Sequence, residues 1–181
     1  MSVIAKPDCG QIADGRHSLP VRVYYEDTDF GGIVYHANYL KFAERGRTEF
    51  LRCLGVDQTA MKAEQGLVFA ARKLTIDFLS PAVMDDQLLV ETWVESIGGA
   101  RLVLAQQVSK ILGAAPELPS DGQASVKMPS DNQDADTLKP LAGLSVTLAC
   151  VDARGRASRL PPVIADAFGA TLSPMSQEPV A

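Results

Sequence analysis

The sequence predicts an α+β fold in which one strand and one long helix precede a run of antiparallel strands. Apolar residues recur at helical spacing from about Asn38 to Leu54, and from Lys73 onwards they alternate with polar residues at a period of two. Gly and Pro separate the alternating segments from one another. The chain has 181 residues, which is enough for one domain with a substantial core and too short for two ordinary domains.

The two ends of the chain frame this domain. Residues 1–18 mix Gly, Asp, Lys and Pro without periodicity, so we expect a flexible N-terminal tail. A β-prone run, Val21–Tyr25, follows and leads into the turn-forming sequence DTDFGG. Residues 171–181 form the expected C-terminal tail, which leaves 19–170 as the single predicted domain.

The predicted helix begins at about Asn38 and has one apolar face. Gly46 lowers the helix propensity in its middle, so we expect another element to approach the helix closely there. Gly55 stands where a left-handed residue commonly ends a helix. The residues of the apolar face are Tyr39, Phe42, Ala43, Gly46, Phe50 and Leu54.

Four segments after the helix alternate between apolar and polar residues, as half-buried strands do. Pro81 closes the first of them, and Gly98–Gly99 predicts a two-residue hairpin turn between the second and the third. Their residues on one face are Leu74, Ile76 and Phe78, then Leu88, Val90, Thr92 and Val94, then Leu102, Leu104, Gln106 and Val108, and finally Leu144, Val146, Leu148 and Cys150.

An interruption of residues 113–140 separates the last two strands. It contains four prolines and several aspartates, and it has almost no large apolar side chains. This composition favours disorder, and loops longer than about 15 residues are commonly functional or disordered. We therefore expect a disordered hairpin insertion, and the alternative is a docking loop for a partner.

Composition limits the classes of function. The apolar share of 46% and the net charge of −5 are typical of a soluble globular protein and argue against nucleic-acid binding. An anionic ligand would need a local basic cluster, because the overall field repels it. Three cysteines without a CxxC spacing indicate a reducing compartment and neither a disulfide framework nor a metal site. We expect a cytoplasmic protein, since no segment resembles a signal peptide or a membrane span.

The segment Tyr24–Arg52 joins a strand end to a helix start through a Gly-rich turn that carries two carboxylates. A helix N-terminus presents unpaired N–H groups and a partial positive charge, which can polarise a carbonyl oxygen. A carboxylate just upstream could attack that carbonyl or activate water. The arrangement suits acyl transfer, although DxD followed by Gly is also a common turn.

The sequences VRVYYEDTDFGGIVYHANYLKFAERGRTEFLR and FAARKLTIDFLSPAVMDDQLLVET resemble the 4-hydroxybenzoyl-CoA thioesterase family. The resemblance is closest to its Tol–Pal-associated acyl-CoA thioesterase branch (YbgC type). It covers roughly residues 19–112 and 143–170, where LPPVIADAF resembles the family's C-terminal helix. It implies a hotdog fold, in which a curved antiparallel sheet wraps one long central helix. It also implies edge-to-edge dimers, often further paired into tetramers, with active sites at the dimer interface.

The resemblance also assigns residues. Asp29 matches the catalytic carboxylate, which acts as nucleophile or as general base towards water. His36 matches the residue at the helix N-terminus whose backbone N–H binds the thioester oxygen; its side chain either assists or only packs. Tyr25 matches a further active-site residue, and the alternative is a strand aromatic that packs on the sheet. The only other histidine, His17, falls in the predicted tail.

Other polar residues near this motif have expected supporting roles. Asp27 more readily caps the turn through side-chain-to-backbone hydrogen bonds. A different hotdog subfamily uses a helix carboxylate for catalysis, whereas we expect Glu44 to orient the site or pair with an arginine. Gly31 and Gly32 give the backbone room beside the thioester. The arrangement needs no cofactor, because coenzyme A is part of the substrate. Candidates for its phosphates are Arg72, Lys73, Arg101, Arg154, Arg156 and Arg159, each of which could equally be solvated surface charge.

The predicted function is hydrolysis of an acyl-CoA thioester to a free acid and coenzyme A. The alternative from another class is a hotdog binding or scaffold protein that contacts acyl carrier protein or the envelope-division machinery. A hotdog dehydratase is a third candidate, and the intact DTDFGGIVYH turn favours the thioesterase over it. The predicted partners are the acyl-CoA substrate, further copies of the chain and, as an option, acyl carrier protein.

Overall fold

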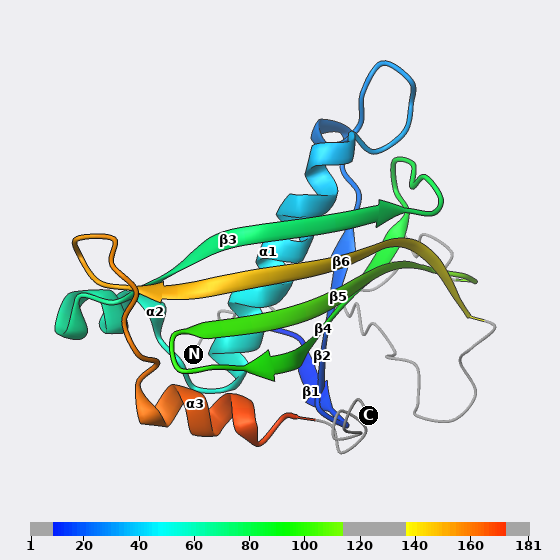
Figure 1. Cartoon of the computed structure of the whole chain (residues 1–181). Coiled ribbons are helices and arrows are strands. Elements are labelled where there is room, and N and C mark those ends of the chain that lie inside the picture. Colours follow the sequence, from blue (N-terminus) through cyan, green and yellow to red (C-terminus); the bar gives the residue numbers. More distant parts are fainter. Residues whose placement is uncertain (1–8, 114–136, 173–181) are drawn as a thin grey trace, which may run out of the picture.

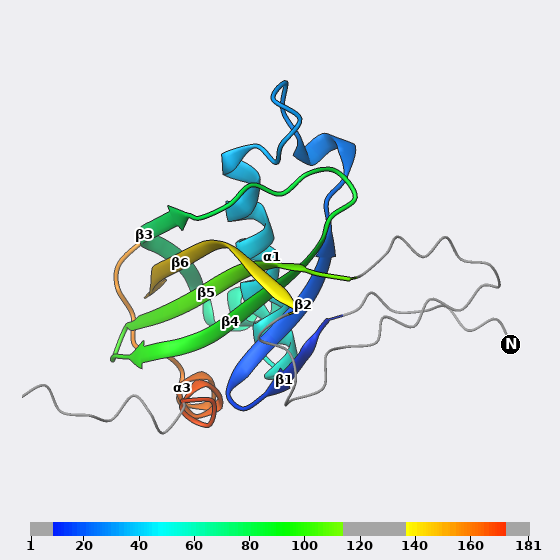
Figure 2. The ribbon, with the colours of Figure 1, turned by 90° about the vertical axis from the view of Figure 1, so that its right-hand side faces the viewer.

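The computed structural model describes residues 9–113 and 137–172. It confirms the predicted α+β class, because one long helix, α1 (His36–Cys53), lies against a six-stranded antiparallel sheet (Figure 1). The strand order is β1-β2-β4-β5-β6-β3, and the sheet curves around α1 (Figure 2). Within these residues, no helix combines the length and the apolarity needed to cross a membrane.

The remaining elements connect and close this arrangement. The strands are β1 (Gln11–Ala13), β2 (Arg16–Arg22), β3 (Val68–Phe78), β4 (Gln87–Ile97), β5 (Arg101–Ile111) and β6 (Leu138–Val151). The short helical segments are η1 (Tyr25–Asp27), α2 (Gln58–Ala60), η2 (Met61–Gln65) and α3 (Pro162–Gly169). The helix α3 confirms the expected C-terminal helix.

The predicted flexible tail is wrong for residues 11–18, because β1 and the start of β2 form a hairpin there. Asp14 and Gly15 both have positive φ angles at its turn, as a tight hairpin turn requires. His17 is fully buried in this hairpin and stacks on Phe50 of α1, with 5.6 Å between ring centroids. The predicted strand Val21–Tyr25 is displaced as well, since β2 ends at Arg22 and Tyr25 begins η1.

The helix matches its prediction closely and starts two residues earlier, at His36. The close approach at Gly46 is confirmed, because a Cβ there would lie 2.8 Å from Val90 Cγ1 and 3.1 Å from Thr92 Oγ1 of β4. Gly55 follows the helix with a φ of 76°, in the left-handed region that favours glycine. The missing side chain at position 46 thus lets α1 lie directly on the sheet.

A polar chain crosses the interior between α1 and the sheet. The buried Gln106 donates to the Ala43 carbonyl and to the Thr92 hydroxyl, both at 2.8 Å. Its oxygen accepts from Arg47 Nη1 at 2.7 Å. Burial lowers the pKa of the Arg47 guanidinium, and the nearby Glu44 carboxylate opposes that shift. Gln106 lies on β5, and its partners lie on α1 and β4, so these hydrogen bonds fix the position of α1 relative to both strands.

Apolar side chains fill the space on either side of this polar chain. One cluster packs the first half of α1, with Tyr39 and Phe42, against β2 and β4. The second cluster packs Phe50 and its neighbours against β5 and β6. Phe168 of α3 joins the second cluster, with its ring centroid 5.8 Å from that of Phe50.

Two predicted connections differ from the structure. Three residues, Gly98–Ala100, join β4 to β5, and neither glycine has the positive φ of the predicted two-residue turn. The strand β6 begins at Leu138, so it takes in the end of the predicted insertion of residues 113–140. Leu138 pairs with Ile111, and Leu112 N donates to the Thr137 carbonyl at 2.6 Å. Residues 114–136 lie outside the described residues.

Candidate active site

A hollow of about 390 Å³ lies at the N-terminus of α1, beside the end of β3. The turn before α1, the first turn of α1 and the segment after β3 each contribute to its wall. Most of that wall is apolar, and Asp29 supplies a carboxylate. The lining residues are Asp29, Ile33, Val34, His36, Tyr39, Phe78, Leu79, Ser80 and Pro81.

The turn that carries Asp29 is fixed by its own backbone. Asp29 N donates to the Ile33 carbonyl, and Gly32 N donates to the Asp29 carbonyl, both at 3.0 Å. Gly32 has a φ of 74°, which only glycine adopts readily. Gly31 N donates to Asp29 Oδ1 at 2.8 Å, so one carboxylate oxygen is held while the side chain stays exposed. The turn therefore aims an exposed carboxylate at the hollow.

The neighbouring Asp27 has the capping role that the sequence predicts. It is buried, and its Oδ2 accepts from Tyr24 N at 2.9 Å. Its carbonyl accepts from Tyr35 N at 2.9 Å and from Asn38 Nδ2 at 2.8 Å. Asp27 thus ties the turn to the first turn of α1, and this fixes Asp29 relative to the helix N-terminus.

His36 is the first residue of α1, so its backbone N–H has no acceptor within the helix. Its imidazole is exposed and lies edge-on to Phe78, with ring centroids 6.4 Å apart. The partial positive charge of the helix N-terminus and the Asp29 carboxylate therefore face the same hollow.

Aromatic rings form the apolar side of the hollow. Tyr39 and Phe78 meet edge to face at 5.6 Å between centroids. The Tyr39 hydroxyl accepts from Ala82 N at 2.9 Å, which ties α1 to the segment after β3. Burial, and secondarily the charge of Asp86, raises the pKa of Tyr39, while the Ala82 hydrogen bond opposes this. The ring is therefore a neutral, fixed part of the wall.

The structure does not bring every predicted site residue to this hollow. Tyr25 is 80% exposed in η1, so it neither packs on a strand nor lines the hollow of its own chain. Glu44 is exposed two turns into α1, where it accepts from the Thr48 hydroxyl at 2.8 Å. Gly31 and Gly32 do not line the hollow; their N–H groups donate to Asp29 and hold its turn. The catalytic roles of Asp29, His36 and Tyr25 stay predictions.

Seven lining residues were missed as site residues: Ile33, Val34 and Tyr39 within the motif, and the segment Phe78–Pro81 outside it. The sequence of Phe78–Pro81 is that of a strand end, and only the pairing of β3 with β6 at the far edge of the sheet places this segment next to α1. The usable signal in the sequence was that the apolar Leu79 directly follows the apolar Phe78 and so breaks the alternation at the end of β3; in the structure both side chains are half exposed or more. No group of three or more His, Cys, Asp or Glu residues that could hold a metal ion occurs in the described ranges.

Comparison with known proteins identifies relatives for this arrangement. Residues 31–111 match the model of the thioesterase superfamily. The acyl-CoA thioesterase YbgC of Haemophilus influenzae is 50% identical over 97 residues, which cover 54% of this chain and 71% of that protein. The acyl-CoA thioester hydrolase YbgC of Escherichia coli is 49% identical over 89 residues, which cover 49% of this chain and 66% of that protein. The aligned part thus spans just under two thirds of the latter.

A more distant relative and two solved structures extend the comparison. The putative acyl-CoA thioesterase YneP of Bacillus subtilis is 30% identical over 67% of this chain and 82% of its own length. A probable thioesterase from Bartonella henselae is 32% identical, with a TM-score of 0.59 over 81% of this chain and 98% of that chain. A 1,4-dihydroxy-2-naphthoyl-CoA thioesterase from Synechocystis is 18% identical, with a TM-score of 0.67 over 85% and 96%. The last likeness supports the hotdog fold alone.

Proposed function

This chain belongs to the thioesterase superfamily and is a thioester hydrolase, and we propose that it hydrolyses acyl-CoA thioesters to a free acid and coenzyme A. One observation carries the proposal: the Asp29 carboxylate and the N-terminus of α1 line the same largely apolar hollow. An acyl chain suits apolar walls, and a thioester carbonyl suits a hydrogen-bond donor beside a carboxylate.

In the proposed reaction the thioester oxygen accepts a hydrogen bond from the His36 N–H. Negative charge develops on that oxygen as the carbonyl carbon is attacked, and the helix N-terminus stabilises it. The coenzyme A sulfur leaves as a thiolate and takes up a proton. The exposed imidazole of His36 lines the same hollow, where it can stabilise the thiolate or deliver that proton. No cofactor is needed for these steps.

Asp29 has two possible roles in that attack. As a general base, it takes a proton from water while the water oxygen bonds to the carbonyl carbon. As a nucleophile, its own oxygen forms an anhydride with the acyl group, and water then hydrolyses the anhydride. Single-turnover reactions in heavy-oxygen water separate the two. Heavy oxygen in every product acid supports the base, whereas its appearance in Asp29 supports the nucleophile.

The test of the proposed function is a thiol-release assay over short, long and aromatic acyl-CoAs. We expect turnover with at least one class, and Asp29→Asn should lower it by ~10²–10⁴-fold. Negligible turnover with the whole panel would contradict the proposal. It would leave the scaffold function, in which the same fold contacts acyl carrier protein or envelope-division proteins of the Tol–Pal type. Pull-down of acyl carrier protein by the inactive Asp29→Asn variant then tests that alternative directly.

We further propose that the enzyme is a homo-oligomer, a dimer or a tetramer, in the cytoplasm. The support for the oligomer is β3, an edge strand of 11 residues, and the exposed apolar residues Phe30, Phe78 and Leu79 near its end. The support for a reducing compartment is an odd number of cysteines without a CxxC spacing.

A further inference from the structure

Two cysteine thiols lie together where the N-terminal hairpin meets the end of α1. Cys53 is the last residue of α1, and its Sγ donates to the Cys9 carbonyl at 3.3 Å. Cys9 Sγ lies 3.7 Å and Cys53 Sγ lies 3.8 Å from the same atom, the carbonyl oxygen of Gly10. The two residues are far apart in the sequence, yet the fold brings both sulfurs to one oxygen.

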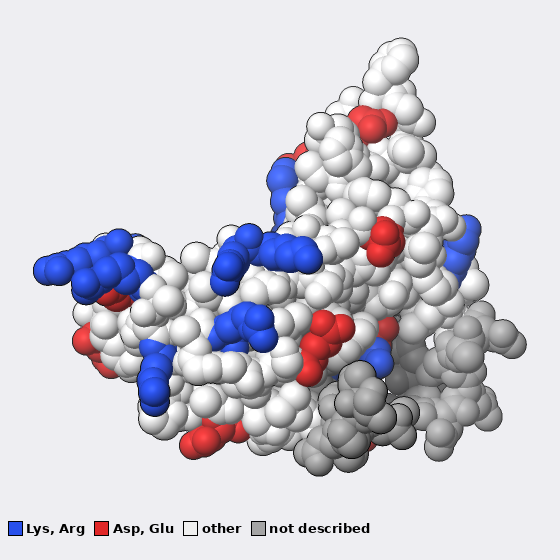
Figure 3. Space-filling view, viewed as in Figure 1, with Lys and Arg blue, Asp and Glu red and all other residues white. Residues whose placement is uncertain are grey.

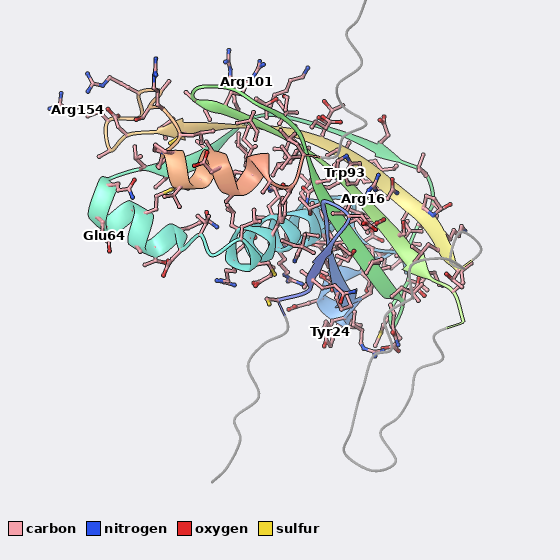
Figure 4. The ribbon with its side chains drawn as sticks, turned by 90° about the horizontal axis from the view of Figure 1, so that it is seen from below. Arg16, Tyr24, Glu64, Trp93, Arg101 and Arg154 are labelled. Atoms are coloured by element: carbon pink, nitrogen blue, oxygen red, sulfur yellow. The ribbon has the colours of Figure 1, made fainter. Side chains whose placement is uncertain are left out.

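The backbone at Cys9 is held in this position by β2. His17 Nε2 donates to the Cys9 carbonyl at 2.7 Å, and His17 is fully buried. Gly10 has a φ of 74°, and a Cβ at this position would collide with the Ser18 carbonyl oxygen. The chain therefore passes β2 too closely for any residue but glycine. Figure 4 shows the hairpin, marked by Arg16, beside α1, against which both of its strands pack.

The placement of the two sulfurs suits a disulfide. Such a bond needs Cα atoms about 4.4–6.8 Å apart and side chains that point towards each other. Cys53 Sγ contacts the carbonyl group of Cys9, which is bonded directly to Cys9 Cα, so it lies within reach of the Cys9 side chain. A change of χ1 rotamer moves Cys9 Sγ without moving the backbone. The bond therefore requires rotation of an exposed side chain and no rearrangement of the fold.

The third cysteine of the chain has different surroundings. Cys150 is buried on β6, and burial raises the pKa of its thiol. The thiolate is the reactive form, so a buried thiol with a raised pKa reacts slowly. Cys9 is exposed and Cys53 is partly buried, so an oxidant in the solvent reaches these two thiols first. Cys150 thus serves as an internal control for the reaction of the other two.

We propose that Cys9 and Cys53 form a redox modification site, which hydrogen peroxide converts to a disulfide that fastens the N-terminal hairpin to the end of α1. The Cys9 thiolate attacks one peroxide oxygen and the O–O bond breaks, which leaves a sulfenic acid on Cys9 and releases one water. The Cys53 thiolate then attacks the Cys9 sulfur and displaces a second water. Each sulfur loses one electron, the peroxide gains two, and the two thiol protons end in the two waters.

The disulfide acts at the end of α1 that lies away from the hollow. The helix runs from His36 at the hollow to Cys53, and 18 residues at ~1.5 Å each span roughly 26 Å. The hairpin closes one edge of the sheet with a β1 of only three residues, so a covalent link supports a weak part of the fold. In a reducing compartment the thiols are the resting state, and the disulfide lasts only while an oxidant is present. Oxidation thus stabilises the domain and leaves the hollow unchanged.

Peptide mapping of the oxidised full chain tests the pair directly. Trypsin places the three cysteines on three separate peptides, residues 1–16, 53–62 and 128–154. The chain is treated with hydrogen peroxide, alkylated under denaturing conditions, digested and examined by mass spectrometry. This oxidant is neutral, so neither the net charge of −5 nor the basic side chains that gather over β3 (Figure 3) steer it. We expect the first peptide linked to the second, and release of both by dithiothreitol.

Three variants sharpen this experiment. Cys9→Ser and Cys53→Ser should each lose the link, whereas Cys150→Ala, the matched control, should keep it. A link to the peptide of Cys150 would contradict the assignment. So would links that only join different chains on a non-reducing gel, or a sulfinic acid on Cys9 beside an unreacted Cys53 thiol.

Thermal unfolding measures what the bond does to the fold. The oxidised wild type should melt roughly 5–15 °C above the reduced wild type, because the bond constrains the unfolded chain. Cys9→Ser, which changes an exposed side chain, should show no such difference between oxidised and reduced samples. Complete linkage without a rise in melting temperature would overturn the fastening of the hairpin.

Turnover gives a separate readout for the distance between this pair and the hollow. The kcat for an acyl-CoA should be the same before and after oxidation, and a loss that Cys9→Ser prevents would refute the separation of the two sites. Linkage and melting are measured without any substrate. The redox site therefore stands or falls independently of the proposed thioesterase reaction.

Discussion

Asp27 and Asp29 stand two residues apart in one turn, yet the fold gives them different surroundings. Asp27 is buried and holds the backbone of the turn, whereas the Asp29 side chain is exposed at the hollow. The motif alone allowed this assignment, because a buried cap and an exposed carboxylate are the two ordinary fates of such residues. The walls of the hollow could not be predicted in the same way, since they come from a segment some 50 positions later in the sequence.

The Asp29 assignment predicts the outcome of a near-isosteric substitution. Asp29→Asn should keep the fold and acyl-CoA binding, and it should lower kcat by ~10²–10⁴-fold because the amide can neither attack nor accept a proton. Steady-state kinetics, with circular dichroism as the folding control, measures this. Glu44→Gln should be milder, since Glu44 lies outside the hollow, and His36→Ala should fall between, because the backbone N–H remains. An inactive Glu44→Gln beside an active Asp29→Asn would assign catalysis to the helix carboxylate.

Tyr39 supports the wall of the site through one hydroxyl. Tyr39→Phe leaves the buried Ala82 N–H without its acceptor, so we expect a loss of about 1–3 kcal/mol in the free energy of unfolding. Urea denaturation measures the loss. Burial raises the Tyr39 pKa, so the fold favours the neutral phenol. That contribution is complete below about pH 10 and is lost as the pH rises through the raised pKa. The alkaline fall in stability should therefore be shallower in the variant, and identical slopes would contradict this.

Among the elements, the central helix and the four long strands were predicted, whereas the N-terminal hairpin was not. Periodicity identifies an element that is long enough to repeat its pattern, and β1 has only three residues. The usable signal was Asp14–Gly15, a strong hairpin dipeptide. His17 misled the prediction further, because a polar residue in a short strand does not reveal that it is buried against Phe50.

The packing of α1 on β4 predicts a coupling between two residues. Gly46→Ala should destabilise the protein, because the overpacking cost of about 1–3 kcal/mol exceeds the gain of up to about 1 kcal/mol in helix propensity. The added Cβ would lie 2.8 Å from Val90 Cγ1, so Val90→Ala should relieve the clash in the double variant. A double-mutant cycle by urea denaturation measures this coupling. Strictly additive effects would show that the helix and the strand do not limit each other at this point.

The β5–β6 connection predicts tolerance to shortening. Leu112 N and the Thr137 carbonyl are joined by a hydrogen bond, so the two strand ends already lie as close as a hairpin requires. Replacing residues 114–136 with a short Gly-containing turn should leave thioesterase activity near that of the full chain. It should change the free energy of unfolding by no more than about 2 kcal/mol, because loop closure depends weakly on length. Unfolding, or loss of most turnover, would indicate that the segment contributes to the domain or the site.

At the scale of the whole molecule, the sheet has two unequal edges. β1 closes one edge with three residues, whereas β3 leaves 11 residues at the other. A long unpaired edge tends to recruit another strand, and β3 carries the site at its Phe78 end. Tyr25 and Phe30, in the segment before α1, are exposed as well, and neither lines the hollow.

These features predict that the chain assembles and that assembly completes the site. Multi-angle light scattering at micromolar concentration should report a multiple of the 19.3 kDa protomer, a dimer or a tetramer. A proline introduced at Thr75 of β3 should weaken assembly, because proline removes a backbone donor from the strand. Thr75 also pairs with Ser145 of β6, so the proline strains the pairing of β3 with β6 within the protomer. Circular dichroism must therefore first show that the variant is folded. A folded monomer with full acyl-CoA turnover would refute both the oligomer and the site shared between two chains, because every contact the substrate needs would then lie on one protomer.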